Sequence, residues 1–485
     1  MIRDGSWDAN IYFLVINWPL IYFVQKPLTA KANKERLTMS NQFSLMREQR
    51  FRPFFFTQFY GAFNDNVFKT ALITLVVFHT ASFAGIDGST VATLLPGLFI
   101  LPFFLFSATA GQIADKYEKS QIIRYVKAFE ICIMLFASAG FFLHNIWLLG
   151  SALFMMGMHS TIFGPVKYSY LPQHLKENEL IGGNGMVEMG SFVAILLGQV
   201  LGAWLATQSQ HEIMTSIAII GIAVMGYWAS HGVPNSPAAD AALKINWNPI
   251  TETYRNIKFI WQHQTIWLAI IAISWFWFYG ATLLAQFPSF AKDVLHGDES
   301  VFVLLLFIFS LGIGIGSLMC EKLSRGKLEL GLVVFGAIGL TLFGADLYYS
   351  SSSIHTHLNV KTLVDYLAFI GKHYDAQGQF IWTYWRLIAD IILIGFFGGL
   401  YIVPLYALIQ TRSEKSHQSR VIAANNILNA LFMVVSSIFS IWIFKQGLNI
   451  PQLFFATAAL NVIIMVYLCI RQPEYLKSFI AWVKR

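Results

Sequence analysis

The chain has 485 residues, of which 56% are hydrophobic and only 12% are charged, and its formal net charge is +7. Because an ordinary soluble domain carries roughly 25% charged residues, this composition excludes a typical soluble protein and favours one embedded in a membrane. The three cysteines, Cys132, Cys320 and Cys469, fall within apolar stretches or at their ends, so neither a disulfide framework nor a zinc site is indicated.

The N-terminal segment differs from the rest of the chain. Its apolar run at 11–24 contains Asn17 and Pro19 and is too short to cross about 30 Å of hydrocarbon as a helix. No small-residue cleavage pattern follows this run, so a signal peptide is not expected. A more ordinary start occurs at Met39. We therefore expect residues 1–38 to lie outside the natural protein, with a surface-lying membrane anchor as the alternative.

The remaining sequence contains twelve apolar stretches of about 20 residues, the length of a helix that crosses the hydrocarbon core. Helices are expected because lipid cannot satisfy open backbone groups and no stretch alternates like a barrel strand. The first six spans are placed at 54–78, 91–113, 121–143, 146–166, 183–206 and 213–231. The second six are placed at 264–288, 300–320, 329–349, 382–408, 421–444 and 452–470.

The 33 Lys and Arg residues are concentrated on one side of this predicted membrane. The odd-numbered loops hold only four of them, Lys292, Lys361, Lys372 and Lys445. By the positive-inside rule, this bias predicts a multi-pass inner-membrane protein with both termini in the cytoplasm. The excess positive charge is then explained by anionic lipid, and no nucleic-acid partner is expected.

A polar break at 232–263 separates six spans from six. Its second part, 250–261, is expected to lie along the membrane as an amphipathic helix. The predicted organisation is an N-terminal cytoplasmic extension (1–50), a six-helix bundle (51–231), a cytoplasmic linker (232–263), a second six-helix bundle (264–470) and a cytoplasmic tail (471–485).

The first span carries two charges near its middle. Asp65 is followed one helical turn later by Lys69 on the same face. Charges at this depth cost several kcal/mol unless they are paired or wetted, so a functional site is the default interpretation. Asn64 and Asn66 flank the acid and add oxygen ligands, so the group could hold Na⁺ or pass a proton. A structural ion pair within the bundle is the alternative.

Three later spans add polar candidates. Arg386 and Asp390 form a second pair of opposite charges with i,i+4 spacing in the tenth span, and Glu188 lies in the inner part of the fifth. His159, alone in the fourth span, is expected to be a packed, hydrogen-bonded histidine rather than a ligand.

Nothing in the sequence indicates catalysis or a bound metal. No nucleophile–base pair stands out, and an intramembrane enzyme is therefore disfavoured. The longest odd-numbered loop, 350–380, carries His355, His357 and His373, but a solvated loop is favoured there over a metal site. No resident cofactor is predicted, apart from the Na⁺ or H⁺ that the first span could use for coupling.

The loop between the second and third spans contains Gly111, Asp115, Lys116 and Lys119. Its order, a Gly, three residues, an Asp and then basic residues, resembles the loop signature of the major facilitator superfamily. A glycine permits close helix approach, and a carboxylate can face a helix N-terminus. We predict that this loop is a conformational latch rather than a substrate site.

The corresponding loop of the second half repeats this plan. Gly316 is followed by Glu321, with one extra residue before the acid, and then by the basic residues Lys322 and Arg325. The resemblance therefore extends to both halves. It implies an all-α integral membrane protein with the major facilitator fold, in which twelve transmembrane helices form two six-helix bundles.

In that superfamily, spans 1, 4, 7 and 10 line a central cavity. The resemblance thus implies that Asp65, Lys69, Arg386 and Asp390 lie where a substrate passes. Together with the two asparagines of the first span and Glu188, they form the predicted site of substrate or ion translocation.

Four segments carry a closer resemblance, to bacterial lysophospholipid transporters, and above all to the transporter half of transporter–acyltransferase fusion proteins. These segments are 55–69, 163–168, 184–188 and 420–426. The resemblance implies inward movement of lysophospholipids of the phosphatidylethanolamine type across the inner membrane, for reacylation inside. The His-x₄-Asp dyad of glycerolipid acyltransferases does not occur, so the resemblance implies a separate lysophospholipid acyltransferase as a partner.

Two other functions fit the same residues. One is a proton- or sodium-coupled transporter of drugs or small metabolites, with Asp65 as its coupling site. The other is a membrane scaffold that recruits a soluble acyltransferase to its basic face.

Overall fold

The computed structural model describes residues 42–78, 88–297, 299–352 and 383–485, and it contains helices but no strand in these ranges. Residues 42–485 form one compact unit. Two predictions lie outside the described residues, namely the interpretation of 1–38 and that of the histidine-bearing loop.

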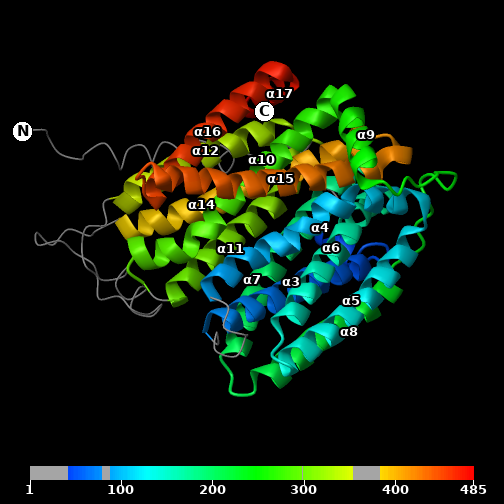
Figure 1. The fold of residues 1–485 in the computed structure, drawn as a ribbon. Coiled ribbons are helices and arrows are strands. Elements are labelled where there is room, and N and C mark those ends of the chain that lie inside the picture. Colours follow the sequence, from blue (N-terminus) through cyan, green and yellow to red (C-terminus); the bar gives the residue numbers. More distant parts are fainter. Residues whose placement is uncertain (1–41, 79–87, 298, 353–382) are drawn as a thin grey trace, which may run out of the picture. The chain divides into compact units, whose positions relative to one another are not determined.

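Within the described ranges, twelve long helices occupy the positions of the twelve predicted spans (Figure 1). In the first half they are α3 (Arg52–Phe78), α4 (Gly88–Lys116), α5 (Lys119–Phe142), α6 (Ile146–His174), α7 (Leu180–Ala206) and α8 (His211–His231). In the second half they are α10 (Gln264–Ser289), α11 (Glu299–Ser324), α12 (Gly331–Ser352), α14 (Thr383–Arg412), α15 (Gln418–Lys445) and α16 (Ile450–Arg471). The all-helical fold class is confirmed.

Among the described residues, eleven of these helices are long and apolar enough to cross a membrane. The exception is α3, because Asn64, Asp65, Asn66 and Lys69 interrupt its apolar sequence. This helix is nevertheless 27 residues long and packs against α7 and α8. It belongs to the same layer of helices as its neighbours, with its polar residues directed into the protein.

Two amphipathic helices lie outside the spans. The helix predicted at 250–261 is α9 (Pro249–Gln262), and α17 (Glu474–Val483) follows the last span. A single boundary among the spans was misplaced by a wide margin. The fourth was predicted to stop at 166, but α6 continues through Pro165 to His174, because membrane helices tolerate the lost donor of a proline.

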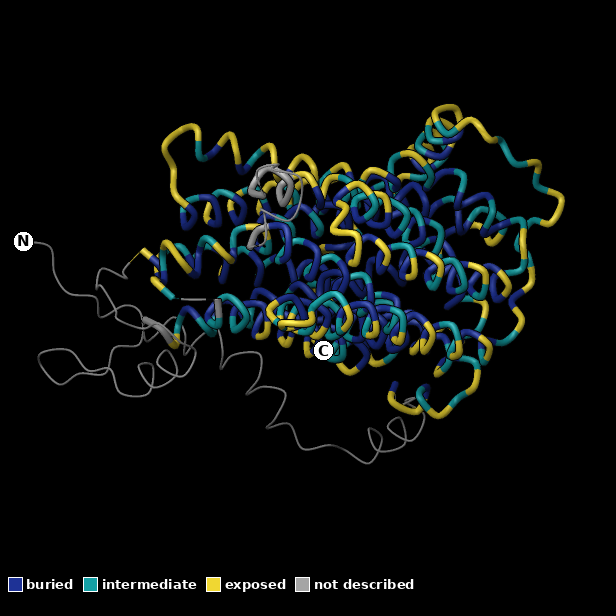
Figure 2. Tube along the Cα trace, turned by 60° about the horizontal axis from the view of Figure 1, so that its bottom comes forward, coloured by how far each residue is buried: buried dark blue, intermediate teal, exposed yellow. Residues whose placement is uncertain are grey.

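Helices of each half pack mainly with one another (Figure 1). In the first half α3 packs against α7 and α8, and α5 against α6 and α8; in the second half α14 packs against α11 and α12, and α12 against α16. The halves meet through two main pairs, α4 with α15 and α7 with α11. The precise boundaries of the two bundles stay a prediction. Buried residues are concentrated between the helices, and exposed ones lie on the outside and in the loops (Figure 2).

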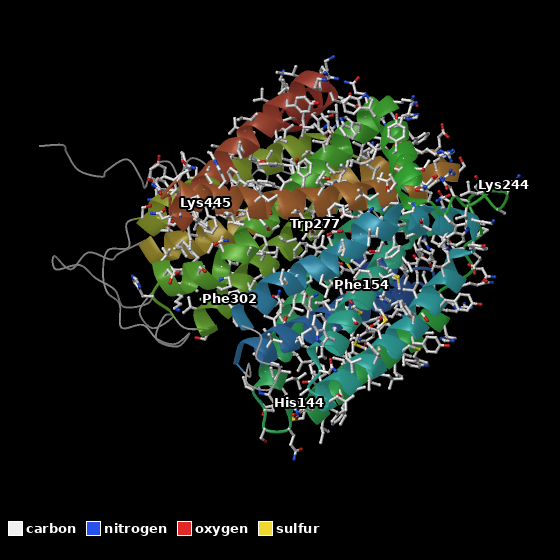
Figure 3. The ribbon with its side chains drawn as sticks, viewed as in Figure 1. His144, Phe154, Lys244, Trp277, Phe302 and Lys445 are labelled. Atoms are coloured by element: carbon white, nitrogen blue, oxygen red, sulfur yellow. The ribbon has the colours of Figure 1, made fainter. Side chains whose placement is uncertain are left out.

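One end of the helices carries the linker between α8 and α9, and we call it the linker face. Figure 3 shows Lys244 of the linker at this end and Lys445, the last residue of α15, at the opposite end. The helices α9 and α17 also belong to the linker face, because each adjoins the linker-side end of a span. The opposite end is called the far face.

Candidate functional site

Asp65 lies in the middle of α3, about 20 Å from the first residue of that helix at 1.5 Å per residue. The hydroxyl of Ser160 on α6 donates a hydrogen bond to its Oδ2 atom at 2.7 Å. The other oxygen, Oδ1, is buried and has no hydrogen-bond partner among the described residues. Since a buried carboxylate oxygen without a donor is costly, this atom is well placed to accept a donor from a ligand.

Lys69, one turn farther along α3, is half-buried. Its ammonium lies 5.3 Å from the centre of the Phe99 ring on α4. Among the described residues it forms no ion pair with Asp65. The direct ion pair considered from the sequence is therefore not observed, although Asp65 still interacts electrostatically with Lys69.

The two asparagines that flank Asp65 point elsewhere. The amide of Asn64 donates to Oε1 of Glu130 at 2.7 Å, and that of Asn66 donates to the carbonyl of Ala62 in its own helix at 2.7 Å. Asn66 also packs closely against Gly198 of α7. The predicted cluster of oxygens around Asp65 is therefore corrected, because successive residues of a helix face in different directions.

A buried ionic network lies beside Asp65 and was not predicted. Lys127 and Glu130 of α5 form an ion pair whose side chains are 1% and 0% exposed. His159 of α6 approaches the same carboxylate, with Nε2 at 3.2 Å from Oε2. The burial of His159 agrees with the expectation of a packed histidine. The i,i+3 spacing of two opposite charges inside the third span was the signal that could have revealed this network.

A second polar group joins the two halves. Tyr168 of α6 donates to Glu188 of α7 at 2.6 Å, and its ring stacks on Tyr406 of α14 with centroids 4.2 Å apart. Lys167 donates to the hydroxyl of Ser191 at 2.9 Å and interacts electrostatically with Glu188. Glu188 thus lies at the contact between the halves, and its role in translocation stays a prediction. Lys167 was included in the sequence analysis only within a segment of family resemblance.

The pair predicted in the tenth span lies at a different depth. Arg386 is in the first turn of α14, about 5 Å from its start by the helical rise, and forms a bidentate ion pair with Asp346 of α12. Asp390 is buried and accepts a hydrogen bond from Ser350 of α12 at 2.8 Å. These charges therefore lie toward the far-face end of the second half and not at the depth of Asp65.

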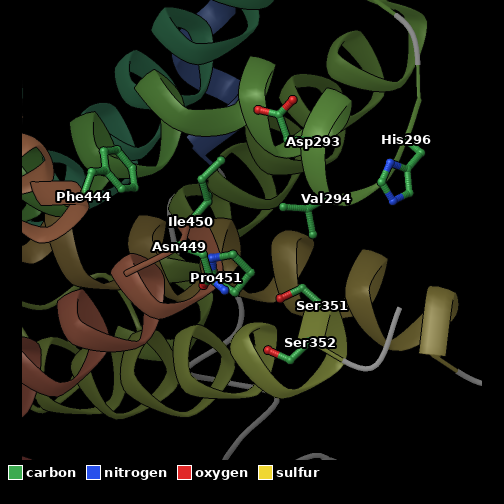
Figure 4. Close-up of a pocket in the computed structure, with 9 residues that line it drawn as sticks. All are labelled: Asp293, Val294, His296, Ser351, Ser352, Phe444, Asn449, Ile450 and Pro451. Carbon is green, nitrogen blue, oxygen red and sulfur yellow. The ribbon is translucent and has the colours of Figure 1, made fainter. Parts of the chain in front are cut away.

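A cavity of about 430 Å³ lies among the described residues (Figure 4). Asp293, His296 and Ser351 are among the residues that line it, and all of its lining comes from the second half. None of the predicted site residues contributes to it. This cavity is therefore separate from the group around Asp65.

The first predicted latch connects α4 to the N-terminus of α15. Asp115 is fully buried and accepts hydrogen bonds from the backbone nitrogens of Ser419 (3.0 Å) and Arg420 (3.3 Å), as well as from the Arg420 side chain at 3.0 Å. A Cβ at Gly111 would lie 2.7 Å from the Cβ of Ala423, so only glycine permits this approach. The acid caps a helix of the other half, where the helix dipole favours negative charge.

The second latch is related but not identical. Glu321 of α11 accepts a hydrogen bond from the backbone nitrogen of Gln42 at 3.0 Å and lies against Gly182 in the first turn of α7. Both acids therefore face the N-terminal turn of a helix from the opposite half. The basic residues predicted for this latch, Lys322 and Arg325, are exposed and are not buried with Glu321.

In the first latch, Lys116 lies over the ring of Tyr117 at 5.7 Å, and Lys119 is buried with its backbone nitrogen bonded to Ser236 of the linker. Glu118, between them, accepts hydrogen bonds from the backbone of Ser236 and Ser120. Burial opposes its charge, but these donors lower the pKa of Glu118 below its ordinary value. The linker is thereby attached to the latch.

Further polar contacts close the linker face. Asn184 of α7 and Gln410 of α14 exchange amide hydrogen bonds at 2.6 and 3.1 Å. The hydroxyl of Ser419 donates to that of Ser169 at 3.0 Å. Together with the latches, these contacts hold the halves together at this end. The structure therefore represents a state whose linker face is closed.

The sequence was compared with known proteins. The family model described as Major Facilitator Superfamily matches residues 54–371. The lysophospholipid transporter LplT of Escherichia coli O127:H6 is 24% identical over 422 residues, which cover 86% of this chain and 94% of that protein. The lysophospholipid transporter LplT of Photorhabdus laumondii is 26% identical over 365 residues, covering 74% and 79% respectively.

Solved structures of transporters share the fold. The human organic anion transporter MFSD10 superposes with a TM-score of 0.66 at 12% identity, covering 86% of this chain and 99% of that one. A bacterial homologue of the iron transporter ferroportin in an outward-facing state gives 0.59 at 15% identity, with 90% and 99% covered. The family match spans both halves and agrees with the twelve helices and the paired latches. This chain belongs to the major facilitator superfamily.

Proposed function

We propose that the protein moves lysophospholipids, of the phosphatidylethanolamine type, inward across the bacterial inner membrane. The names of relatives that match most of the chain support this substrate class. The observation that carries the proposal is the pair of opposite charges on α3, in which Oδ1 of Asp65 has no hydrogen-bond partner among the described residues. A phosphoethanolamine headgroup is itself a zwitterion. Its ammonium complements the buried oxygen of Asp65 that lacks a partner, and its phosphate complements Lys69.

The second polar group would receive the headgroup nearer the linker face. Lys167 and Tyr168 lie beside Glu188 at the contact between halves, and a cation next to a carboxylate again suits a zwitterion. Asp65 and Lys167 belong to α3 and α6, the first and fourth spans of the fold. Movement of the headgroup from the first group to the second would carry it toward the linker face.

We also propose that the linker face is cytoplasmic, because the positive-inside rule assigns the Lys- and Arg-rich side to the cytoplasm. The start of the first span, α3, and the helix α17, which follows the last span, then both lie inside the cell. A lysophospholipid acyltransferase is the proposed partner on that side, since its reaction consumes the imported lipid.

The test is uptake of labelled lysophosphatidylethanolamine by spheroplasts. Asp65→Asn removes the charge while preserving size and is expected to lower uptake about 10- to 100-fold, since a hydrogen bond to a charged group contributes roughly 1.5–3 kcal/mol. Lys445→Gln, an exposed far-face substitution, is the control and is expected to leave uptake unchanged.

Failure of the unmodified protein to raise uptake above that of cells without it would contradict the proposal. Collapsing the proton and sodium gradients separates the alternative. Uptake that survives both treatments supports a lipid carrier without ion coupling, whereas complete loss supports an ion-coupled transporter that uses Asp65.

A further inference from the structure

The helix α9 presents two contrasting faces. Glu252, Asn256 and Ile260, spaced four residues apart, are buried against the protein. On the other side, Ile250 and Tyr254 are 81% and 66% exposed. Large apolar side chains in contact with water are costly, so a surface of this kind is expected to have an occupant.

The membrane interface is within reach of this exposed face. The apolar face continues at Trp261, which is 65% exposed, and at Trp247 just before the helix, which is 71% exposed. The ring of Trp261 lies 4.8 Å from that of Trp267, in the first turn of the following span α10. Because α9 is directly joined to a spanning helix, its apolar face lies at the level of the lipid headgroups.

Positive side chains accompany the apolar ones. Lys244, Arg255 and Lys258 are all exposed, and the nearest carboxylate interaction is a long one, 3.8 Å between Arg255 and Glu252. Aromatic and aliphatic residues interleaved with cations at an interface are the pattern that binds anionic lipid. The charge complementarity selects an anionic phospholipid surface as the occupant.

The same segment is attached to the closed latch. Asn246, just before α9, exchanges two hydrogen bonds with Gln112 of α4, at 2.7 and 3.0 Å. Asp240 donates its backbone N–H to the carbonyl of Asp115 at 2.9 Å, and its carboxylate lies 3.5 Å from Arg420 of α15. The linker therefore contacts both halves where they meet.

The helix α9 itself also reaches the second half. The ring of Phe259 stacks on His417, directly before α15, with centroids 4.8 Å apart. If the halves separated at the linker face, α9 could not keep its contacts with both α4 and α15. The position of α9 thus differs between closed and open states, and a ligand that binds one position better shifts the equilibrium.

We propose that the linker and α9 form a binding surface for anionic phospholipid headgroups, and that lipid bound there favours the closed linker face. This inference does not depend on which molecule is transported. It rests on the fact that one segment carries both the exposed apolar and basic surface and the contacts that complete the latch.

The experiment reads the latch with a thiol. Ser419→Cys, in a Cys132→Ser background, places a thiol where the closed state buries it. The full chain is reconstituted in phosphatidylcholine vesicles with or without phosphatidylglycerol, and modification of residue 419 by membrane-permeant N-ethylmaleimide is followed by mass spectrometry. We expect phosphatidylglycerol to slow modification several-fold.

Two matched variants locate the effect. Arg255→Gln with Lys258→Gln removes two charges from α9 and is expected to abolish the lipid dependence. Lys292→Gln with Lys445→Gln removes two exposed charges from the far face and is expected to preserve it. Gln112→Ala, which leaves the lipid surface intact but removes both hydrogen bonds between α4 and the backbone of Asn246, should retain association with phosphatidylglycerol vesicles and lose the slowing.

Equal rates of modification in the two lipid compositions would overturn the proposal. So would an equal loss of the lipid effect in the far-face control, because the effect would then follow net charge rather than α9.

Discussion

The charged groups of the two halves differ in depth and in how they are satisfied. In the first half, Asp65 lies mid-helix with an unpartnered oxygen, beside the fully buried ion pair of Lys127 and Glu130. In the second half, Arg386 and Asp346 pair near the far face, with 25% and 19% of their side chains exposed. The latches recur in both halves, whereas the deep charges do not.

This difference assigns separate roles. An ion pair that is reached by solvent contributes little to stability and offers no unsatisfied charge. A buried carboxylate oxygen without a donor, such as Oδ1 of Asp65, is costly, and a charge at this depth is by default a functional site. On the proposed function, recognition of charge is therefore expected in the first half.

The largest expected effect concerns the buried ion pair. Glu130→Ala leaves Lys127 without its partner inside a dry bundle and is expected to destabilise the protein by about 3–5 kcal/mol. Asp346→Ala, at the partly exposed pair, should cost about 1 kcal/mol or less. Denaturant unfolding in detergent, followed by tryptophan fluorescence, measures both. Equal losses at the two sites would break the contrast between the halves.

The next effect concerns how much each of two positively charged side chains, Lys69 and Arg386, contributes to transport. Lys69→Gln is expected to reduce lysophosphatidylethanolamine uptake about tenfold, because the phosphate loses its charged donor. Arg386→Gln should change uptake less than about threefold, because its guanidinium is already paired with Asp346. The measurement is the initial rate of uptake by each variant, normalised to the amount of protein in the membrane. A larger loss at Arg386 would place recognition in the second half instead.

The corresponding glycines of the two latches are expected to respond differently. At Gly111 an added Cβ meets Ala423 of the other half, whereas at Gly316 it would lie 1.9 Å from the carbonyl oxygen of Phe396 in the same half. Gly111→Ala should open the linker face and speed thiol modification of Ser419→Cys several-fold. Gly316→Ala should instead lower stability by about 1–3 kcal/mol through overpacking. The reverse assignment would contradict the packing described here.

The smallest effect is a pH dependence at Glu118. The pKa of Glu118 is lower in the folded protein than its ordinary value of 4.5. The carboxylate therefore contributes fully to the stability of the linker contact above pH 4.5, and this stabilisation is lost as the pH falls below that value. Hydrogen exchange of the Ser236 segment should therefore accelerate below about pH 4.5. Glu118→Gln should show fast exchange at every pH. A Ser236 segment that stays protected in this variant would show that the carboxylate does not hold the linker.

The sequence predicted the helices more fully than the contacts between them. Apolar length and charged loops determine where a span begins and ends, so most bounds agree within a few residues. The helix α6 is longer than predicted because a proline inside a membrane helix does not have to end it. The central depth of Asp65 followed from its position in the span. The pairing of Arg386 with Asp346 did not, since partner choice depends on how neighbouring helices are rotated.

The site was predicted in part for the same reason. Asp65, Lys69 and Glu188 lie where their spans place them, but Asn66 faces α7 and Asp390 faces α12. A periodic apolar pattern gives little information on rotation in helices that are apolar all round. Neighbouring helices decide which polar groups meet, and those contacts appear only in the folded structure.

The most direct measurement compares two lipids, of which one carries a positively charged ammonium group in its headgroup and the other does not. Asp65→Asn is assayed for uptake of lysophosphatidylethanolamine, which carries the ammonium, and lysophosphatidylglycerol, which does not. If Asp65 accepts the ammonium, the substitution lowers uptake of the first lipid at least about tenfold and leaves the second much less affected. An equal loss for both lipids would contradict recognition of the headgroup by this carboxylate.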